Sequence, residues 1–155
     1  MGSGAIMCLL ESAEACTRRG GRPRAMLEDA RTLYAAETAM AGRMRQVLES
    51  IGPVQSIVSS ANGTWIDRVE ALAIKSLAPV VSSLYGYMPE LFSAAPLAAI
   101  AAVLATRRLP ALLGGGLQDS DSATAAGGEE KVDSFVALCT GYTGTAAVAR
   151  LRVLD

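Results

Sequence analysis

The stretch Ser134-Phe-Val-Ala-Leu-Cys-Thr-Gly-Tyr-Thr-Gly-Thr-Ala-Ala-Val-Ala-Arg150 carries no charged side chain before its final arginine. Acidic residues precede it and arginines close it, which is the charge order that complements a helix dipole. Small residues recur at every fourth position: Ala137, Gly141, Thr145 and Ala149. These features predict a helix over residues 133–150 whose small-residue side lets a second helix approach closely.

A second uncharged stretch lies upstream of the first. Residues 91–106 carry no charge, and two arginines follow them directly. Small residues again recur at every fourth position: Ala94, Ala98 and Ala102. We expect a second helix over about residues 91–108. A polar, low-complexity loop at 114–128, which has too little apolar surface to order itself, would join the two helices.

Length alone does not decide whether these two helices cross a membrane. At 1.5 Å per residue each uncharged stretch of 16 residues would be about 24 Å long, whereas a hydrocarbon core is about 30 Å thick. Composition favours the membrane, because a water-soluble core of this size is normally filled with leucine, isoleucine and phenylalanine. The sequence therefore predicts a transmembrane helical hairpin. A soluble bundle of alanine-rich helices is the alternative.

Part of the first stretch also resembles the glycine-rich turn of short-chain dehydrogenases. Residues 135–138 would form a strand, and Thr140-Gly141-x-x-Gly144-x-x-Ala147 would place a pyrophosphate at a helix N-terminus. Alanine stands where the third glycine is expected. That turn normally opens a βαβ unit of about 30 residues, whereas the sequence ends five residues after Arg150. We therefore interpret the glycines as helix contacts and expect no bound nucleotide.

The first half of the sequence has the apolar spacing of amphipathic helices. Apolar residues step by three and four in the ranges 4–17, 25–51 and 64–77. The expected fold class is thus all-α. It would comprise an amphipathic helical region at 1–78 and the hydrophobic hairpin at 79–155.

Local signals mark the ends of these amphipathic helices. Gly52-Pro53 predicts the end of the second helix, because glycine suits a left-handed cap and proline prevents continuation. Thr64 and Asp67 have capping-box spacing at the start of the third helix. Glu37 falls near the apolar stripe of the second helix, where it either reaches water or needs an arginine partner.

Composition argues against several classes of function. The 14 basic and 15 acidic residues give a net charge of -1, which does not favour a nucleic-acid partner. The absence of histidine excludes His-based triads and His-containing metal sites. Three cysteines without a CxxC pair indicate packing residues in a reducing compartment: Cys8, Cys16 and Cys139. Asp67 and Glu70 are expected to be solvated charges on a polar helix face. We therefore predict no enzyme and no catalytic, cofactor-binding or metal-binding residue.

These features together predict a non-catalytic accessory subunit of a membrane protein complex. Its partners would be the other subunits and the lipid bilayer, with no small-molecule substrate. An arginine-bearing N-terminal region without disulfides would fit an organelle inner membrane, such as that of the mitochondrion. The alternative function is a soluble all-α interaction or oligomerisation module.

Overall fold

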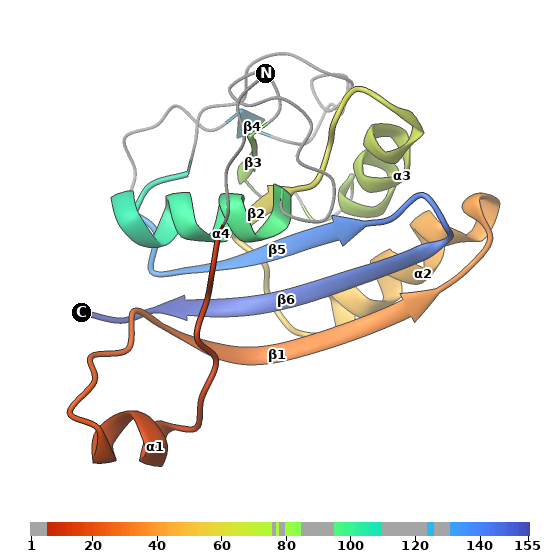
Figure 1. The fold of residues 1–155 in the computed structure, drawn as a ribbon. Coiled ribbons are helices and arrows are strands. Elements are labelled where there is room, and N and C mark those ends of the chain that lie inside the picture. Colours follow the sequence, from red (N-terminus) through yellow and green to blue (C-terminus); the bar gives the residue numbers. More distant parts are fainter. Residues whose placement is uncertain (1–5, 76, 78–79, 85–94, 110–123, 126–130) are drawn as a thin grey trace.

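The fold is mixed α/β, with one sheet between helices (Figure 1). The computed structural model describes residues 6–75, 77, 80–84, 95–109, 124–125 and 131–155. The helices are α1 (Ala13–Arg18), α2 (Glu37–Ser50), α3 (Trp65–Ile74) and α4 (Ala95–Thr106). The strands are β1 (Ala25–Tyr34), β2 (Ser56–Ser59), β3 (Val80–Ser83), β4 (Thr124–Ala125), β5 (Ser134–Thr140) and β6 (Thr145–Val153).

The first and last strands, β1 and β6, are neighbours in the sheet. Its strand order is β1-β6-β5-β2-β3-β4. Strands β2 to β5 run parallel, whereas β6 runs antiparallel to both of its neighbours, β5 and β1. The β1–β6 pairing extends from Ala25 opposite Val153 to Tyr34 opposite Thr145. The predicted regions 1–78 and 79–155 therefore share a single sheet.

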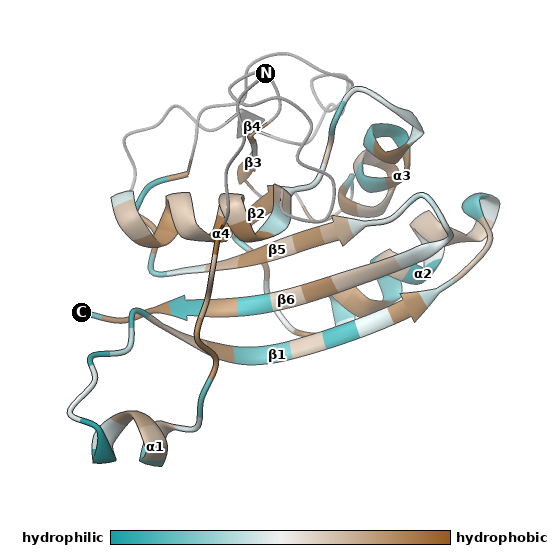
Figure 2. Cartoon of the chain, viewed as in Figure 1, coloured by the Kyte–Doolittle hydropathy of each residue, from teal (hydrophilic) through white to brown (hydrophobic). Residues whose placement is uncertain are grey.

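Helices cover both faces of this sheet. In Figure 1, α4 lies in front of the sheet, and α2 and α3 lie behind it. Along β5, Val136 and Leu138 pack in the core with α2 and α3, whereas Phe135 and Ala137 pack in the core with α4. This alternation follows from the strand period of two. A strand covered on both faces has no position that suits a charge, and Figure 2 shows β5 in hydrophobic colours along most of its length.

The predicted helix at 133–150 is therefore wrong, because this stretch forms the antiparallel hairpin of β5 and β6. A tight turn joins the strands, and in it the Gly141 N–H donates to the Thr145 carbonyl oxygen at 2.8 Å. Gly144 occupies the left-handed region with a φ of 78°. The stretch is thus uncharged because its residues are buried between two helix layers within a protein core.

The predicted membrane helix at 91–108 is also wrong. Helix α4 covers 12 residues and buries Ala98, Ala99 and Val103. Within the described ranges, no helix combines the length and the apolar composition that a membrane crossing requires. Of the predicted loop at 114–128, only Thr124–Ala125 falls within the described residues, and this pair forms β4.

The expected all-α fold class is wrong in the first half of the sequence as well. The predicted helix at 25–51 divides into β1 and α2, and the predicted helix at 4–17 is reduced to α1. The range 64–77 contains α3. Pairing with β6 draws residues 25–34 into the sheet, so a tertiary contact overrides the local helical spacing. Gly52 has a φ of 90° directly after the end of α2, at the stop that Gly-Pro indicates.

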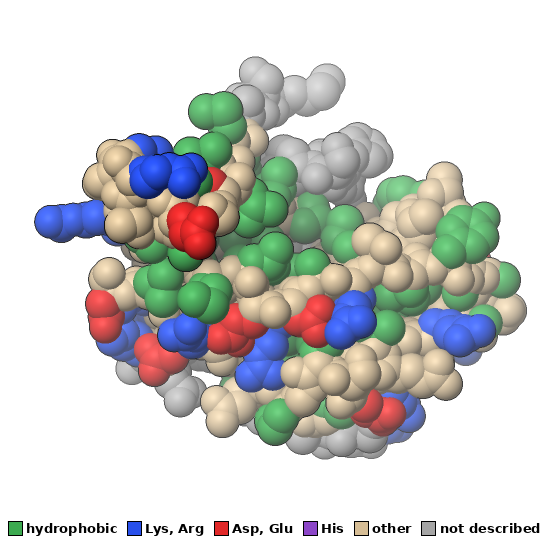
Figure 3. Space-filling model, turned by 90° about the horizontal axis from the view of Figure 1, so that it is seen from below, with side chains coloured by type: hydrophobic (Ala, Val, Ile, Leu, Met, Phe, Trp, Pro, Cys, Tyr) green, Lys and Arg blue, Asp and Glu red, His purple; other side chains and the backbone are tan. Residues whose placement is uncertain are grey.

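Strand β1 forms an edge of the sheet and carries paired charges. Glu28 accepts from Arg152 at 2.7 Å and lies 3.3 Å from the Arg150 guanidinium, while Asp29 lies 2.8 Å from Arg31. Figure 3 looks onto this edge and shows acidic and basic side chains in alternation. Exposed or partly exposed pairs of this kind contribute little to stability, so the backbone pairing with β6 holds β1 in register.

We predict that Phe135→Ala destabilises the chain much more than Leu97→Ala. Phe135 of β5 is 2% exposed in the core beneath α4, whereas Leu97 of α4 is 39% exposed. The first substitution should cost about 3 to 5 kcal/mol of unfolding free energy, and the second less than about 1 kcal/mol. Urea unfolding followed by circular dichroism measures both. Equal losses would contradict the assignment of Phe135 to the core.

Candidate functional site

The candidate site lies at the carboxyl ends of two neighbouring parallel strands. Ile57 and Val58 of β2 pair with Val136 and Ala137 of β5. The chain leaves these strands in opposite directions, since β3 lies beyond β2 and β6 lies beyond β5. In open α/β sheets, ligands bind in the crevice outside the carboxyl ends of strands at such a divergence. The loop after β2 and the turn after β5 meet there.

A buried carboxylate joins this loop to the end of β5. Glu70 of α3 has no exposed surface and accepts hydrogen bonds from four donors. These are Ser59 Oγ at 2.5 Å, the Ser60 amide at 3.0 Å, the Ser60 hydroxyl, and Thr140 Oγ1 at 2.6 Å. The donors come from both strand ends, so Glu70 fixes one strand end relative to the other.

Burial controls the electrostatics of this cluster. The loss of hydration raises the pKa of Glu70, and the hydrogen bonds from Ser59, Ser60 and Thr140 offset part of that rise. The pKa of the Cys139 thiol is also raised, first by its own burial and then by the charge of Glu70. Cys139 is therefore held as a neutral thiol, which is a poor nucleophile.

Asp67, one turn before Glu70, holds the backbone of the same loop. Its carboxylate accepts from the amides of Asn62 at 2.8 Å and of Gly63 at 3.1 Å. Asp67 is 6% exposed and Glu70 is not exposed at all. The prediction that both are solvated charges is therefore wrong, because this side of α3 faces the loop and β5.

The loop is connected to the β5–β6 turn through an amide and two aromatic rings. Asn62 Nδ2 donates to the Tyr142 hydroxyl at 2.7 Å, and Thr64 Oγ1 donates to Asn62 Oδ1 at 2.6 Å. The Tyr142 ring meets the Trp65 ring edge to face, with centroids 6.4 Å apart and planes at 75°. These contacts fix the orientation of the Trp65 ring at the start of α3 and of the Tyr142 ring in the β5–β6 turn.

The same turn touches the segment between β1 and α2. The Ala35 amide donates to the Gly144 carbonyl oxygen at 3.0 Å. A Cβ at position 144 would lie 2.7 Å from the Ala35 carbonyl oxygen, and the φ of 78° already disfavours other residues. Glycine is thus required where the two backbones meet.

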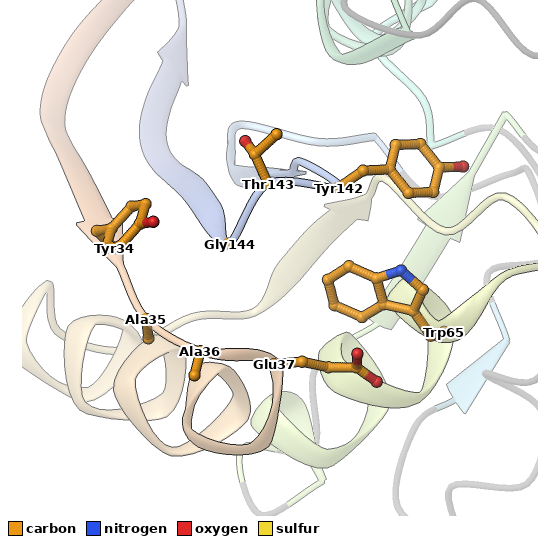
Figure 4. Close-up of a pocket in the computed structure, with 8 residues that line it drawn as sticks. All are labelled: Tyr34, Ala35, Ala36, Glu37, Trp65, Tyr142, Thr143 and Gly144. Carbon is orange, nitrogen blue, oxygen red and sulfur yellow. The ribbon is translucent and has the colours of Figure 1, made fainter.

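Between these segments lies a pocket of about 350 Å³. Figure 4 shows the residues that line it: Tyr34, Ala35, Ala36, Glu37, Trp65, Tyr142, Thr143 and Gly144. The lining comes from β1, the start of α2, the start of α3 and the β5–β6 turn. Three segments distant in sequence thus build one site: residues 34–37, Trp65 and residues 142–144.

The pocket offers aromatic surfaces, hydroxyl groups and one carboxylate. Tyr34 lies across the pocket from Trp65, and Glu37 extends toward the Trp65 side (Figure 4). Cys139 is not part of the lining. Among the described residues, no three His, Cys, Asp or Glu side chains gather closely enough to hold a metal ion. The chemistry available here is the binding and orientation of an organic ligand.

The small residues expected at helix contacts lie on several elements. Ala98 and Ala102 belong to α4, and Ala94 lies outside the described residues. The others lie on the β5–β6 hairpin: Ala137, Gly141, Thr145 and Ala149. Ala137 and Ala149 are directly opposite partners beneath α4. Their small side chains let this helix lie close to the sheet, and none of the four is in a helix.

Sequence reasoning missed the pocket and its support. It found the Thr64 cap, whose Oγ1 accepts from the Ile66 amide at 3.4 Å, but it did not connect Asp67 and Glu70 to the loop before them. The available signal was the polar run Ser59-Ser-Ala-Asn-Gly-Thr64 directly after an apolar pair, followed by these two carboxylates one turn apart.

No family model matches the sequence, and no curated protein sequence matches it. The structure, however, is similar to solved ketosynthases. A chain of the AntDE:AntF complex, described as a type II polyketide synthase acyl-carrier protein with its ketosynthase bound to the hexaketide, is 20% identical over 94% of this chain, with a TM-score of 0.71. The ketosynthase of module 1 of the bacillaene synthase from Bacillus amyloliquefaciens FZB42 is 15% identical over 92% of this chain, with a TM-score of 0.72.

A β-ketoacyl synthase from Burkholderia phymatum STM815 is 16% identical over 94% of this chain, with a TM-score of 0.70. The chain covers 42%, 32% and 41% of these three solved chains, so it spans less than half of their length. At such identities the likeness establishes the fold. The class is therefore a ketosynthase-like α/β fold.

This fold corrects the predicted function. A membrane accessory subunit, with lipid and membrane-complex partners in a mitochondrial inner membrane, is wrong. Of the two membrane helices on which it depended, the one at 133–150 is a β-hairpin and the one at 91–108 contains only the 12-residue helix α4. The alternative all-α module is wrong for the same reason. The predictions of no enzyme and no small-molecule substrate are also overturned, since the solved structures that share the fold are ketosynthases and a β-ketoacyl synthase.

We predict that Glu70→Ala unfolds far more easily than Glu70→Gln. Alanine leaves four donors without an acceptor, two of them buried and two partly buried, which should cost about 3 kcal/mol or more. Glutamine keeps an oxygen for the Ser60 amide and the Ser59 hydroxyl, and the hydroxyl groups of Ser60 and Thr140 can rotate to accept from its NH₂ group. Urea unfolding of both variants measures the difference, and equal stabilities would contradict the hydrogen-bond cluster.

The pH dependence of stability tests the same carboxylate. Because the folded pKa of Glu70 lies above its ordinary value of 4.5, the folded chain binds this proton more tightly than the unfolded chain does. The resulting stability is complete below about pH 4.5 and is lost as the pH rises through the folded pKa. Relative to Glu70→Gln, the wild-type chain should therefore lose unfolding free energy between about pH 4.5 and pH 8. A rise over this range would contradict the prediction.

We predict opposite effects for two glycine-to-alanine substitutions. Gly144→Ala should cost about 2 kcal/mol or more, because the new Cβ meets the Ala35 carbonyl and the φ is strained. Gly42→Ala, within α2 where a Cβ meets nothing within 4 Å, should gain about 0.5 to 1 kcal/mol. Thermal and urea unfolding give both values. A neutral Gly144→Ala would contradict the close approach.

Proposed function

We propose that this chain is a ketosynthase-related component of an acyl-chain-building enzyme and that its pocket binds a thioester-linked acyl chain. The observation that carries the proposal is the likeness of nearly the whole chain to ketosynthases, 94% of it in the AntDE:AntF complex at a TM-score of 0.71. That structure includes an acyl-carrier protein and a hexaketide. A carrier-bound acyl chain is accordingly the proposed substrate class.

The pocket has the features that an acyl chain requires. Its volume of about 350 Å³ falls within the range of about 300 to 1,000 Å³ typical of small-molecule sites. The rings of Tyr34, Trp65 and Tyr142 offer apolar surface to a hydrocarbon chain. Hydroxyl groups of the two tyrosines and of Thr143 are available as donors to a thioester carbonyl.

The supporting hydrogen bonds give this pocket a fixed shape. Asp67 and Glu70 hold the loop before α3, and Asn62 in that loop holds the Tyr142 hydroxyl. Ligand groups are bound more strongly when the residues that contact them are already in place. Because the chain spans less than half of the matched ketosynthases, the proposal assigns to it one wall of an acyl-chain site.

A fluorescence titration tests the proposal, since Trp65 is the sole tryptophan of the sequence. The probe is the N-acetylcysteamine thioester of hexanoate, and free N-acetylcysteamine is the control ligand. The thioester should change Trp65 emission with a saturating dependence on concentration, and the control should not.

A pair of variants then locates the binding. Tyr142→Leu removes an aromatic wall and should weaken binding about five- to tenfold. Leu72→Ala, at an exposed position of α3 outside the pocket lining, should leave binding unchanged. No saturable difference between thioester and control would contradict the proposed function.

A further inference from the structure

The pocket combines three aromatic rings with one charged group. That group is the carboxylate of Glu37, and none of the lining residues is basic, although the sequence contains 14 lysines and arginines. The lining therefore carries a negative charge and no positive one, which favours a positively charged ligand group over a negatively charged one.

Several acidic side chains of this chain pair with arginines, whereas Glu37 has no arginine partner among the described residues. Glu11, Asp29 and Asp155 each pair with an arginine, and Glu28 pairs with two. Glu37 is exposed and, within the described part of the chain, has neither an ion pair nor a side-chain hydrogen bond. Its charge is therefore available to a ligand in the pocket.

The position of Glu37 at the start of α2 reduces this negative field without cancelling it. A helix N-terminus carries about half a positive charge, whereas an ionised carboxylate carries a full negative one. The rings add to the same preference, because their faces are negative and attract a cation within about 6 Å of the ring centre. Tyr34 and Trp65 lie on opposite sides of the pocket, and the Glu37 side chain extends toward the Trp65 side (Figure 4).

From this combination we infer that the pocket takes an acyl chain whose end remote from the thioester carries an organic ammonium group. This inference rests on the proposed function. The ammonium group lies beside the Trp65 ring, where the carboxylate of Glu37 neutralises its charge. A neutral chain gains the apolar contacts but not the charge interaction. A chain ending in a carboxylate is repelled by Glu37.

Two thioesters of equal shape test the inference. One is the N-acetylcysteamine thioester of 4-(trimethylammonio)butanoate, and the other is that of 5,5-dimethylhexanoate, in which a carbon atom replaces the charged nitrogen. Trp65 emission reports both titrations. The cationic thioester should bind about tenfold more tightly at low salt, and added sodium chloride should reduce this preference.

Matched variants on α2 assign the preference to one side chain. Glu37→Gln should reduce the preference to about twofold or less, since only the rings then distinguish the two probes. Glu49→Gln removes an equal charge from an exposed position near the other end of the helix and should leave the preference unchanged.

Each outcome separates this inference from the function on which it rests. Equal or tighter binding of the neutral thioester would overturn the inference and leave the proposed function standing. Saturable binding of neither thioester would overturn both. A preference that survives Glu37→Gln would show that Glu37 is not its source and would likewise overturn the inference.

Discussion

Burial of β5 on both of its faces is the constraint on which the rest of the structure depends. Its side chains alternate between the core under α4 and the core shared with α2 and α3. The strand pairs with β2 on one side and with β6 on the other. Since β1 is joined to the sheet only through β6 among the described strands, the position of the β1 edge also follows from β5. The small side chains of Ala137 and Ala149 pack in the core beneath α4.

The buried carboxylate of Glu70 links the core strands to the loop and the turn that border the pocket. It binds donors from the ends of β2 and β5 at once, and a carboxylate in such a place is stable only while each of its oxygens is hydrogen bonded. Asp67 and Asn62 extend the same ordering to the loop and to Tyr142. A fixed core arrangement therefore becomes a fixed pocket, which is what a site for a flexible acyl chain needs if binding is not to be offset by ordering costs.

Much of the error in the sequence-based fold came from one ambiguity. A strand buried on both faces and a helix buried in lipid both appear as a continuous uncharged run. At residues 134–149 the small-residue spacing favoured the helix, yet Ala137 and Ala149 are cross-strand partners. The dehydrogenase-like pattern placed a strand at 135–138 and a glycine turn after it, and both are present. The turn, however, leads into the antiparallel strand β6 and not into a helix.

The sequence by itself determined the features that depend on neighbouring residues. These are the Thr64 cap of α3 and the end of α2 before Gly52. Only the tertiary structure decided that residues 25–34 form a strand, that Asp67 and Glu70 are buried, and that Tyr34, Glu37, Trp65 and Tyr142 line one pocket. The physical reason is the distance along the sequence between the residues whose contacts fix each feature. A cap or a helix end is fixed by contacts within a few residues. The features decided by the tertiary structure depend instead on pairings between segments up to 128 residues apart, as between Ala25 and Val153, which no local pattern encodes.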